Sequence, residues 1–216
     1  MDITWLGHSS FRLNGKTGTV VTDPYDSATV GLKFPPVSAD IVTVSHQHDD
    51  HNNTKAVKDV RKVVDGPGEY EIQGISLIGI SSFHDDEKGQ KRGSNTIFVI
   101  EMDKLRLCHL GDLGHALEKK QLDLIGDIDV LMVPVGGTYT LNYKAAEEVT
   151  RKIEPRVIIP MHYKHPEMKS DLAGKLAPVE PFVTGMGAKV KKESKLKLNL
   201  SSLPEDEQQI VLLELK

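Results

Sequence analysis

Seven consecutive residues, Ser45 to His51, carry three histidines and two aspartates in the order SHQHDDH. Imidazole nitrogens and carboxylate oxygens together suit divalent zinc, iron or manganese. Side chains so close in sequence reach one centre only where the backbone turns sharply, and four of them can hold two ions. The segment therefore indicates a metal-dependent enzyme more strongly than a solvated polar loop.

Other candidate ligands stand where apolar segments end, and these segments have the character of buried strands. A metal site needs ligands that are held to a fraction of an ångström, and the ends of strands in a rigid sheet provide this. The strands and the ligands that follow them are Ile41–Val44 before the histidine motif, Ile75–Phe83 before His84, Leu105–Leu110 before Gly111 and Asp112, and Val157–Met161 before His162.

The rest of the chain reads as further short strands with a few helices between them. Helical periodicity is expected over Leu117–Ile125 and in a helix that begins near Thr140 or Asn142 and ends at Ile153. A helical segment near Asn53–Asp59 should follow the histidine motif. The remaining expected strands are Ile3–Gly7, Ser10–Leu13, Thr19–Thr22, Lys62–Val64, Thr96–Met102, Val130–Val135, Lys195–Leu200 and Ile210–Leu215.

Composition describes an ordinary globular chain of 216 residues, with 38% hydrophobic and 27% charged residues. No repeat or low-complexity linker divides it, so a single domain over residues 1–216 is expected. The net charge of −4 gives no global cationic field and argues against nucleic acid as a partner. The basic run Lys189–Lys197 is expected to be the solvated face of an edge strand.

The chain has one cysteine, Cys108, within an apolar segment, so a buried packing role is expected and an intrachain disulfide is not possible. No signal peptide is evident at the N-terminus, and no apolar run approaches the ~20 residues of a membrane span. These features predict a cytoplasmic protein that does not associate with a membrane. The sequence does not determine the oligomeric state.

With these residues in place, the chain resembles members of the metallo-β-lactamase superfamily. The resemblance spans nearly the whole chain. Two further segments, WLGHSSF at Trp5–Phe11 and VPVGG at Val133–Gly137, are similar to the branch of L-ascorbate-6-phosphate lactonase-like hydrolases. The resemblance implies an α+β fold, the four-layer αββα sandwich, with a site at one edge of the two sheets.

The resemblance also implies two divalent metal ions, with Zn2+ favoured and Mn2+ or Fe2+ as alternatives. It assigns His46, His48 and His84 to one ion, Asp50, His51 and His162 to the other, and Asp112 to a bridging position. Asp50 would also be catalytic, orienting the attacking hydroxide, whereas Asp49 would be only a neighbour. Asp23 either supports the ligands or simply forms a turn before Pro24.

Several assignments stay open at this point. His109 lies in a strand context comparable to that of His84 and could exchange roles with it, although an interior position suits it as well. His8 could hydrogen-bond to Asp23 or to another residue that supports the ligands, and His115 could reach the pocket mouth or begin a helix. His165 is expected at the surface. Substrate polarity is expected from the pocket rim, from Arg92, Asn95, Thr138, Tyr163 and Lys164, of which Arg92 and Lys164 could receive a phosphate or carboxylate.

The leading hypothesis is a hydrolase that directs hydroxide from a dinuclear site at a small polar ester, lactone or phosphodiester. The length of the chain leaves no room for the inserted domains or arms of the superfamily's RNA-processing members. A second hypothesis is a metal-binding regulatory or scaffold module of the same fold without turnover. A third is an iron-dependent redox or dioxygenase member, which the full set of seven ligands disfavours.

Overall fold

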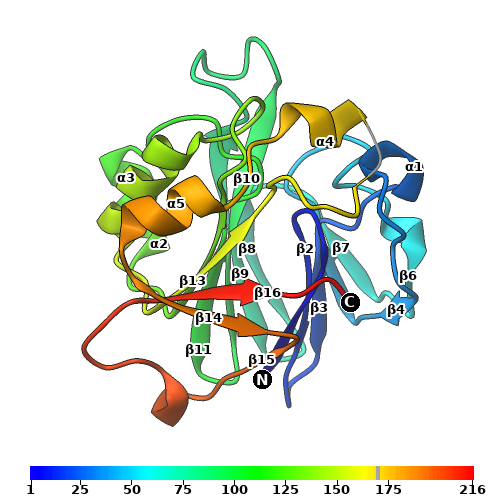
Figure 1. Cartoon of the computed structure of the whole chain (residues 1–216). Helices are drawn as coiled ribbons and strands as arrows, with labels where there is room; N and C mark the ends of the chain where they lie inside the picture. Colours follow the sequence, from blue (N-terminus) through cyan, green and yellow to red (C-terminus); the bar gives the residue numbers. More distant parts are fainter. Residues whose placement is uncertain (169–170) are drawn as a thin grey trace.

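Two β-sheets stack face to face in the computed structural model, which describes residues 1–168 and 171–216 (Figure 1). The first sheet has six strands in the order β15-β1-β2-β3-β5-β7, and the second has eight in the order β14-β16-β13-β12-β11-β10-β9-β8. The strands of the first sheet are β1 (Asp2–Gly7), β2 (Ser10–Asn14), β3 (Thr19–Thr22), β5 (Ile41–Thr43), β7 (Lys62–Val64) and β15 (Leu196–Lys197). Those of the second are β8 (Gly68–Ile72), β9 (Ile75–Phe83), β10 (Ser94–Met102), β11 (Leu105–His109), β12 (Val130–Pro134), β13 (Val157–Met161), β14 (Lys189–Glu193) and β16 (Gln209–Leu213).

Helices cover the outer faces of both sheets and complete four αββα layers, as expected (Figure 1). Helices α2 (Lys119–Ile125), α3 (Tyr143–Ile153) and α5 (Glu180–Met186) lie outside the eight-stranded sheet. The layer outside the six-stranded sheet is thinner, with α1 (Ser27–Val30) and a separate strand pair. The remaining elements are that pair, β4 (Val37–Ser38) and β6 (Val57–Lys58), helix α4 (Asp171–Lys175), and the 3-10 turns η1 (Thr54–Ala56) and η2 (Leu200–Ser202).

The pairing pattern directs the ends of many strands to one edge of the sandwich. In the first sheet β3 is parallel to β5, and β1 runs the same way because it and β3 are both antiparallel to β2. In the second sheet β11, β12 and β13 are mutually parallel, and β9 shares their direction because β10 is antiparallel to both β9 and β11. The residues that follow these strands therefore gather at one edge.

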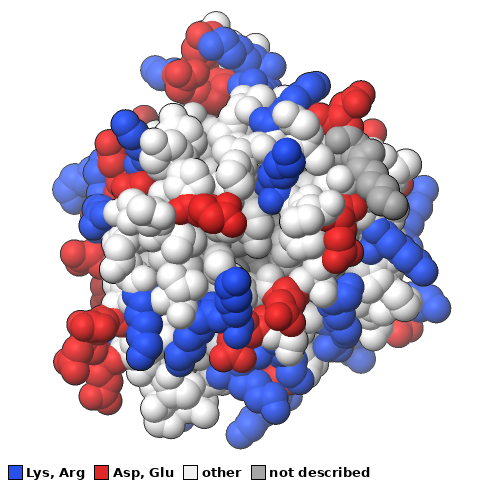
Figure 2. All heavy atoms as spheres, in the orientation of Figure 1, with Lys and Arg blue, Asp and Glu red and all other residues white. Residues whose placement is uncertain are grey.

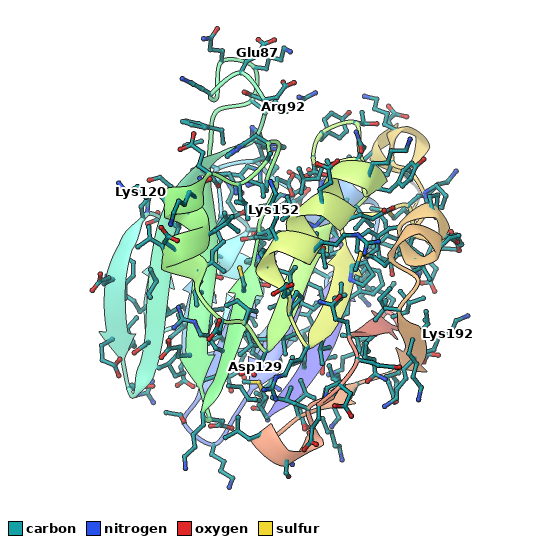
Figure 3. The ribbon with its side chains drawn as sticks, turned by 90° about the vertical axis from the view of Figure 1, so that its left-hand side faces the viewer. Glu87, Arg92, Lys120, Asp129, Lys152 and Lys192 are labelled. Atoms are coloured by element: carbon teal, nitrogen blue, oxygen red, sulfur yellow. The ribbon has the colours of Figure 1, made fainter. Side chains whose placement is uncertain are left out.

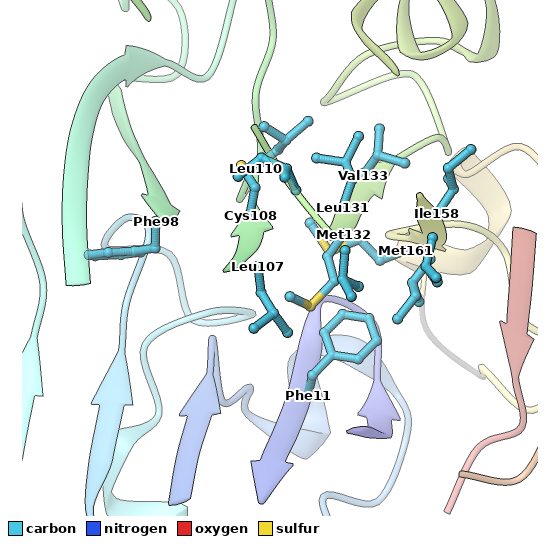
Figure 4. Close-up of a cluster of buried hydrophobic side chains, with 14 of the residues drawn as sticks. Phe11, Phe98, Leu107, Cys108, Leu110, Leu131, Met132, Val133, Ile158 and Met161 are labelled. Atoms are coloured by element: carbon cyan, nitrogen blue, oxygen red, sulfur yellow. The ribbon is translucent and has the colours of Figure 1, made fainter. Parts of the chain in front are cut away.

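Aliphatic and aromatic side chains from both sheets fill the space between them and make one continuous core (Figure 4). All five residues of β12 are buried because the strand is paired on both sides and covered on both faces. Cys108 lies in the core as expected, and burial raises the pKa of its thiol far above the usual value. The rigid interior fixes the strand ends that carry the candidate ligands.

Most expected strands are confirmed, and the basic run forms an exposed edge strand, β14, as predicted. The helix expected near Asn53–Asp59 is wrong, because η1 is a single turn and Val57 then enters a parallel pair with Val37. Asp59 has φ +60°, a left-handed value that ends any helix there. The strand expected over Lys195–Leu200 shrinks to β15.

No helix in the described part of the chain is long and apolar enough to cross a membrane. Acidic and basic side chains are interspersed over the face shown in Figure 2, so no single sign of charge dominates it. This distribution agrees with the small net charge of −4.

Candidate metal centre

The histidine motif follows β5 and turns sharply, as its spacing requires. The backbone N–H groups of His51 and Asn52 both donate to the carbonyl of His48, at 2.9 and 3.1 Å. This turn brings His46 and His48 beside His84, which follows β9. One nitrogen from each of the three rings lies within 4.8 Å of the others. The structure thus gathers the three residues that the resemblance assigned to one ion.

A second group forms around Asp50, His51 and His162, whose ligand atoms also lie within 4.8 Å of one another. The same group contains His8, which follows β1 in a tight turn with φ +52°. His8 Nε2 lies 3.3 Å from an Asp50 carboxylate oxygen, and its ring centroid lies 4.1 Å from that of His162. Sequence reasoning did not include His8 among the ligands.

Asp112 lies between the two groups and is 1% exposed. Its Oδ2 atom is 3.1 Å from His162 Nε2, 3.2 Å from His84 Nε2 and 3.3 Å from His51 Nε2. His46 Nε2 lies at 4.0 Å. A single carboxylate therefore faces histidines from both groups, which is the position that a bridging ligand needs.

Asp23 orients two of these histidines through hydrogen bonds, so it does more than form a turn. One of its oxygens accepts the Ser45 backbone N–H at 2.8 Å, and the other accepts the Ser45 hydroxyl at 2.6 Å and His51 Nδ1–H at 2.8 Å. Because the Ser45 hydroxyl donates to Asp23, it must accept from His46 Nδ1–H, 2.9 Å away. Both rings therefore direct an unprotonated Nε2 toward the centre when neutral.

Replacing Asp23 with asparagine should weaken metal binding about 10- to 100-fold, because the amide cannot accept from Ser45 and His51 as the carboxylate does. Competition against a fluorescent chelator measures this affinity. Asp26→Asn is the matched control, since this carboxylate caps α1 and belongs to neither group. An unchanged affinity in the Asp23 variant would contradict the assigned role.

Burial and nearby charges set the protonation of the cluster. Burial lowers the pKa of His46 to about 3 and that of His8 to about 4, so both rings are neutral, as metal ligation requires. Burial also opposes charging of His51, but the carboxylates of Asp112 and Asp50 outweigh it and raise the pKa of this imidazole. Burial favours the neutral form of Asp112, yet His162 and His51 hold its pKa well below the usual value.

The polar atoms at the centre fit divalent cations. Within the described residues, the Nε2 atoms of His46, His51 and His162 and the Oδ1 atom of Asp112 are buried without a hydrogen-bond partner. Buried polar atoms normally have partners, so a cluster of unpaired acceptors indicates a missing positive group. Imidazole and carboxylate donors suit zinc, manganese and iron.

Close packing and side-chain hydrogen bonds place the loop that carries Asp112. Gly111 has φ +57°, and a side chain there would collide with Asn95 and Ser45. The Asn95 side chain accepts the Asp112 backbone N–H at 2.9 Å and donates to the Leu110 carbonyl, also at 2.9 Å. The expectation that Asn95 lies at the pocket rim is therefore wrong, because it is 1% exposed and holds the Asp112 turn.

The remaining histidines lie outside the groups of candidate ligands. His109 Nε2–H donates to the Ser9 carbonyl and its Nδ1 accepts Gly111 N–H, which confirms an interior role. His115 Nε2 accepts the Phe83 backbone N–H while its Nδ1–H donates to the Ala116 carbonyl. His165 is half-buried and packs edge-on against the ring of Trp5, so the expected surface position is only partly right.

With the geometry established, similarity to known proteins defines the class. Residues 2–162 match the family model of the β-lactamase superfamily domain. A Thermotoga maritima protein, described as a proposed Zn-dependent hydrolase of the metallo-β-lactamase superfamily, is 40% identical with a TM-score of 0.81. The match covers 100% of this chain and 99% of that one. The chain belongs to the metallo-β-lactamase superfamily.

Curated relatives of this chain are named UPF0173 metal-dependent hydrolases. Those from Thermoplasma acidophilum and Archaeoglobus fulgidus are each 28% identical over 188 and 196 residues, which is 76% of this chain and 83% of theirs. A protein from Parabacteroides distasonis, described as a proposed metal-dependent hydrolase, shares the fold. It is 19% identical, with a TM-score of 0.67 over 99% of this chain and 93% of that one. The expected superfamily is confirmed, while the lactonase-like branch stays a prediction.

Proposed function

We propose that this chain is a metal-dependent hydrolase that holds two divalent cations and acts on a small polar ester, lactone or phosphodiester. The observation that carries the proposal is the position of Asp112 Oδ2, which faces histidine nitrogens of both ligand groups at 3.1 to 4.0 Å. Zn2+ is the metal that we favour, and Mn2+ or Fe2+ suits the same donors.

The candidate ligands form two sets at this centre. His46, His48 and His84 would hold one cation, and Asp50, His51 and His162 would hold the other, with Asp112 between them. Bound divalent cations lower the pKa of water from 15.7 to about 7 and polarise the oxygen under attack.

The protein surroundings keep these side chains in place. Asp23 holds His51 and, through Ser45, His46 in the tautomer that leaves Nε2 free. Asp50, half-buried at the edge of the second group, is placed to accept a hydrogen bond from the attacking nucleophile. His8 fixes the orientation of the Asp50 carboxylate from the other side.

We also propose a small molecule as the substrate and the cytoplasm as the location. One buried cysteine and the absence of a disulfide fit a reducing compartment. The net charge of −4 argues against nucleic acid, which leaves a small molecule as the substrate that we favour.

The single tryptophan provides a direct test of metal binding that does not depend on turnover. Trp5 Nε1–H donates to the His8 carbonyl at 3.0 Å, and its ring stacks on Tyr163, the neighbour of His162. We expect Zn2+ or Mn2+ added to chelator-treated protein to change Trp5 fluorescence and to saturate at two ions per chain. His162→Ala should abolish the second equivalent.

The same loaded protein is then assayed against a panel of lactones, carboxylic esters and phosphodiesters. Hydrolysis that disappears with chelator and returns with metal supports the proposal. Saturation with two ions but no turnover of any class would favour the non-catalytic metal-binding module instead. If the protein shows no fluorescence response and binds no metal, both the hydrolase proposal and the metal-binding module are overturned.

A further inference from the structure

A cavity of about 370 Å3 opens beside the metal centre, and His84 forms part of its wall. The other walls come from the loop between β9 and β10, from the segment that follows Asp112, and from the segment that leads into α3. A molecule in this cavity would therefore touch the edge of the first ligand group. The cavity is the place where a part of the substrate away from the bond under attack would lie.

The loop between β9 and β10 is built around the Asp85 carboxylate. Its two oxygens accept four backbone N–H groups at 2.7 to 2.9 Å. The last of these donors is Arg92, so the turn fixes the position from which the Arg92 side chain projects. Figure 3 shows Arg92 at the base of this loop and Glu87 at its tip.

The Arg92 side chain is held over the cavity by two contacts. Nη2–H donates to the Thr138 carbonyl at 3.1 Å, and the guanidinium group lies 5.5 Å from the centroid of the Tyr139 ring. Arg92, Thr138 and Tyr139 all line the cavity. A guanidinium group has five N–H donors in a planar fork, so further donors remain for a carboxylate or phosphate.

Helix α3 adds positive potential to the same cavity. Asn142, its N-cap, and Ala145, in its first turn, both line the wall. The helix has 11 residues and no acidic residue in its first turn, where Lys144 is found instead. The N-terminal end of such a helix favours an anion, and no side-chain carboxylate is found in that turn. Asn142 Oδ1 already accepts the Ala145 N–H at 3.1 Å, so the helix contributes its positive end and not that N–H group.

Two carboxylates, those of Asp85 and Asp86, also belong to the wall, and each has partners of its own. Asp85 is fully engaged with the four backbone N–H groups, and Asp86 is exposed with Lys91 at 3.9 Å. Lys175 Nζ lies 5.9 Å from the centroid of the Tyr139 ring and adds a second cation behind that residue. By contrast, Lys164, which sequence reasoning placed at the rim, does not line this cavity.

We infer that the substrate carries a carboxylate or phosphate group away from the bond that is hydrolysed, and that this cavity binds that group through Arg92 and the N-terminus of α3. The inference rests on the proposed function, since it names the substrate class of the same site. The sequence predicted only a polar substrate, whereas this cavity favours an anionic one.

Two esters with acyl chains of equal length test the inference in metal-loaded protein. Mono-p-nitrophenyl glutarate carries a remote carboxylate, and p-nitrophenyl valerate does not. Arg92→Ala should lower the ratio of kcat/KM for the glutarate ester to kcat/KM for the valerate ester about 10- to 100-fold, as expected for the loss of hydrogen bonds to a charged group. Lys88→Asn, which removes an exposed cation of the same loop that does not line the cavity, should leave the ratio unchanged. For Arg92→Lys, this ratio should lie between that of Arg92→Ala and that of the wild type.

Calorimetry with glutarate and with methyl phosphate measures anion binding without turnover and shows which group binds more tightly. Both affinities should fall at least about tenfold in Arg92→Ala at unchanged metal content. If the wild type hydrolyses no member of the lactone, ester and phosphodiester panel but binds these anions through Arg92, the proposed function fails and the anion site stands. If Arg92→Ala lowers kcat/KM equally for the two esters, the inference is overturned. It is also overturned if Arg92→Ala binds both anions as tightly as the wild type does.

Discussion

Replacing Asp112 with alanine is expected to reduce metal-dependent hydrolysis by at least about 10³-fold, because cations at such a centre supply several kcal/mol of transition-state stabilisation. The Asp112 carboxylate faces nitrogens of both ligand groups, with His162 Nε2 closest at 3.1 Å. Bound metal, measured by elemental analysis after gel filtration, should fall from two ions per chain to one or fewer.

The Asp112 variant should still fold, because Asp112 is not part of the hydrophobic core between the sheets. Circular dichroism and the thermal unfolding midpoint of the chelator-treated proteins provide the control. Full metal content together with wild-type turnover in a folded variant would show that Asp112 does not bridge the two groups.

Replacing Asp50 with alanine should remove turnover to a similar extent while the chain stays folded. Asp50 belongs to the second ligand group and lies half-buried at its edge, where it can also orient the nucleophile. Its neighbour Asp49 is exposed and belongs to neither group, so Asp49→Ala is a control that differs by one position. Steady-state kinetics with the best substrate of the ester panel measures both variants.

The variants Asp49→Ala and Asp50→Ala together also test which aspartate of the motif is the metal ligand. If Asp49→Ala lost activity and Asp50→Ala kept it, the assignment of the carboxylate role would be reversed. Equal turnover of Asp50→Ala and wild type would refute the assignment of Asp50 altogether. The expected pattern is a loss confined to Asp50.

The sequence predicted the two sheets because their strands are apolar runs that end in turn residues. The shared edge was foreseeable for His84, Asp112 and His162, since each follows such a run directly. His8 also follows a strand, β1, but its position depends on β1 and β3 both pairing antiparallel with β2. Both pairings are local hairpins, but the place of His8 beside His162 depends on contact between segments far apart in the chain, which residue spacing does not encode.

Two predictions from the sequence, the helix near Asn53–Asp59 and the rim position of Asn95, are wrong because contacts with distant segments override local preference. Val57 and Lys58 read as part of a helix, but a parallel pairing with β4, about twenty residues earlier, overrides the local preference. Asn95 reads as a rim residue because it is polar and near a strand end. In the structure it pairs across the sheet with Ser82 and turns inward to hold the Asp112 loop. A polar residue at a strand end can support the site instead of meeting the substrate.

The cavity that we propose for the anionic group could be predicted from the sequence only in part. Arg92 was a candidate from its closeness to His84, yet it is the four hydrogen bonds to Asp85 and the contact with Tyr139 that give it a defined place. Tyr139, Lys175 and the N-terminus of α3 lie far from Arg92 in sequence. Only the tertiary arrangement brings them together.

Anomalous diffraction from crystals soaked in Zn2+ or Mn2+ tests the central claim most directly. The account predicts two peaks about 3.5–4 Å apart, one among His46, His48 and His84 and the other among Asp50, His51 and His162, with Asp112 touching both. No peak in either group, with the imidazoles turned away from one another, would contradict it.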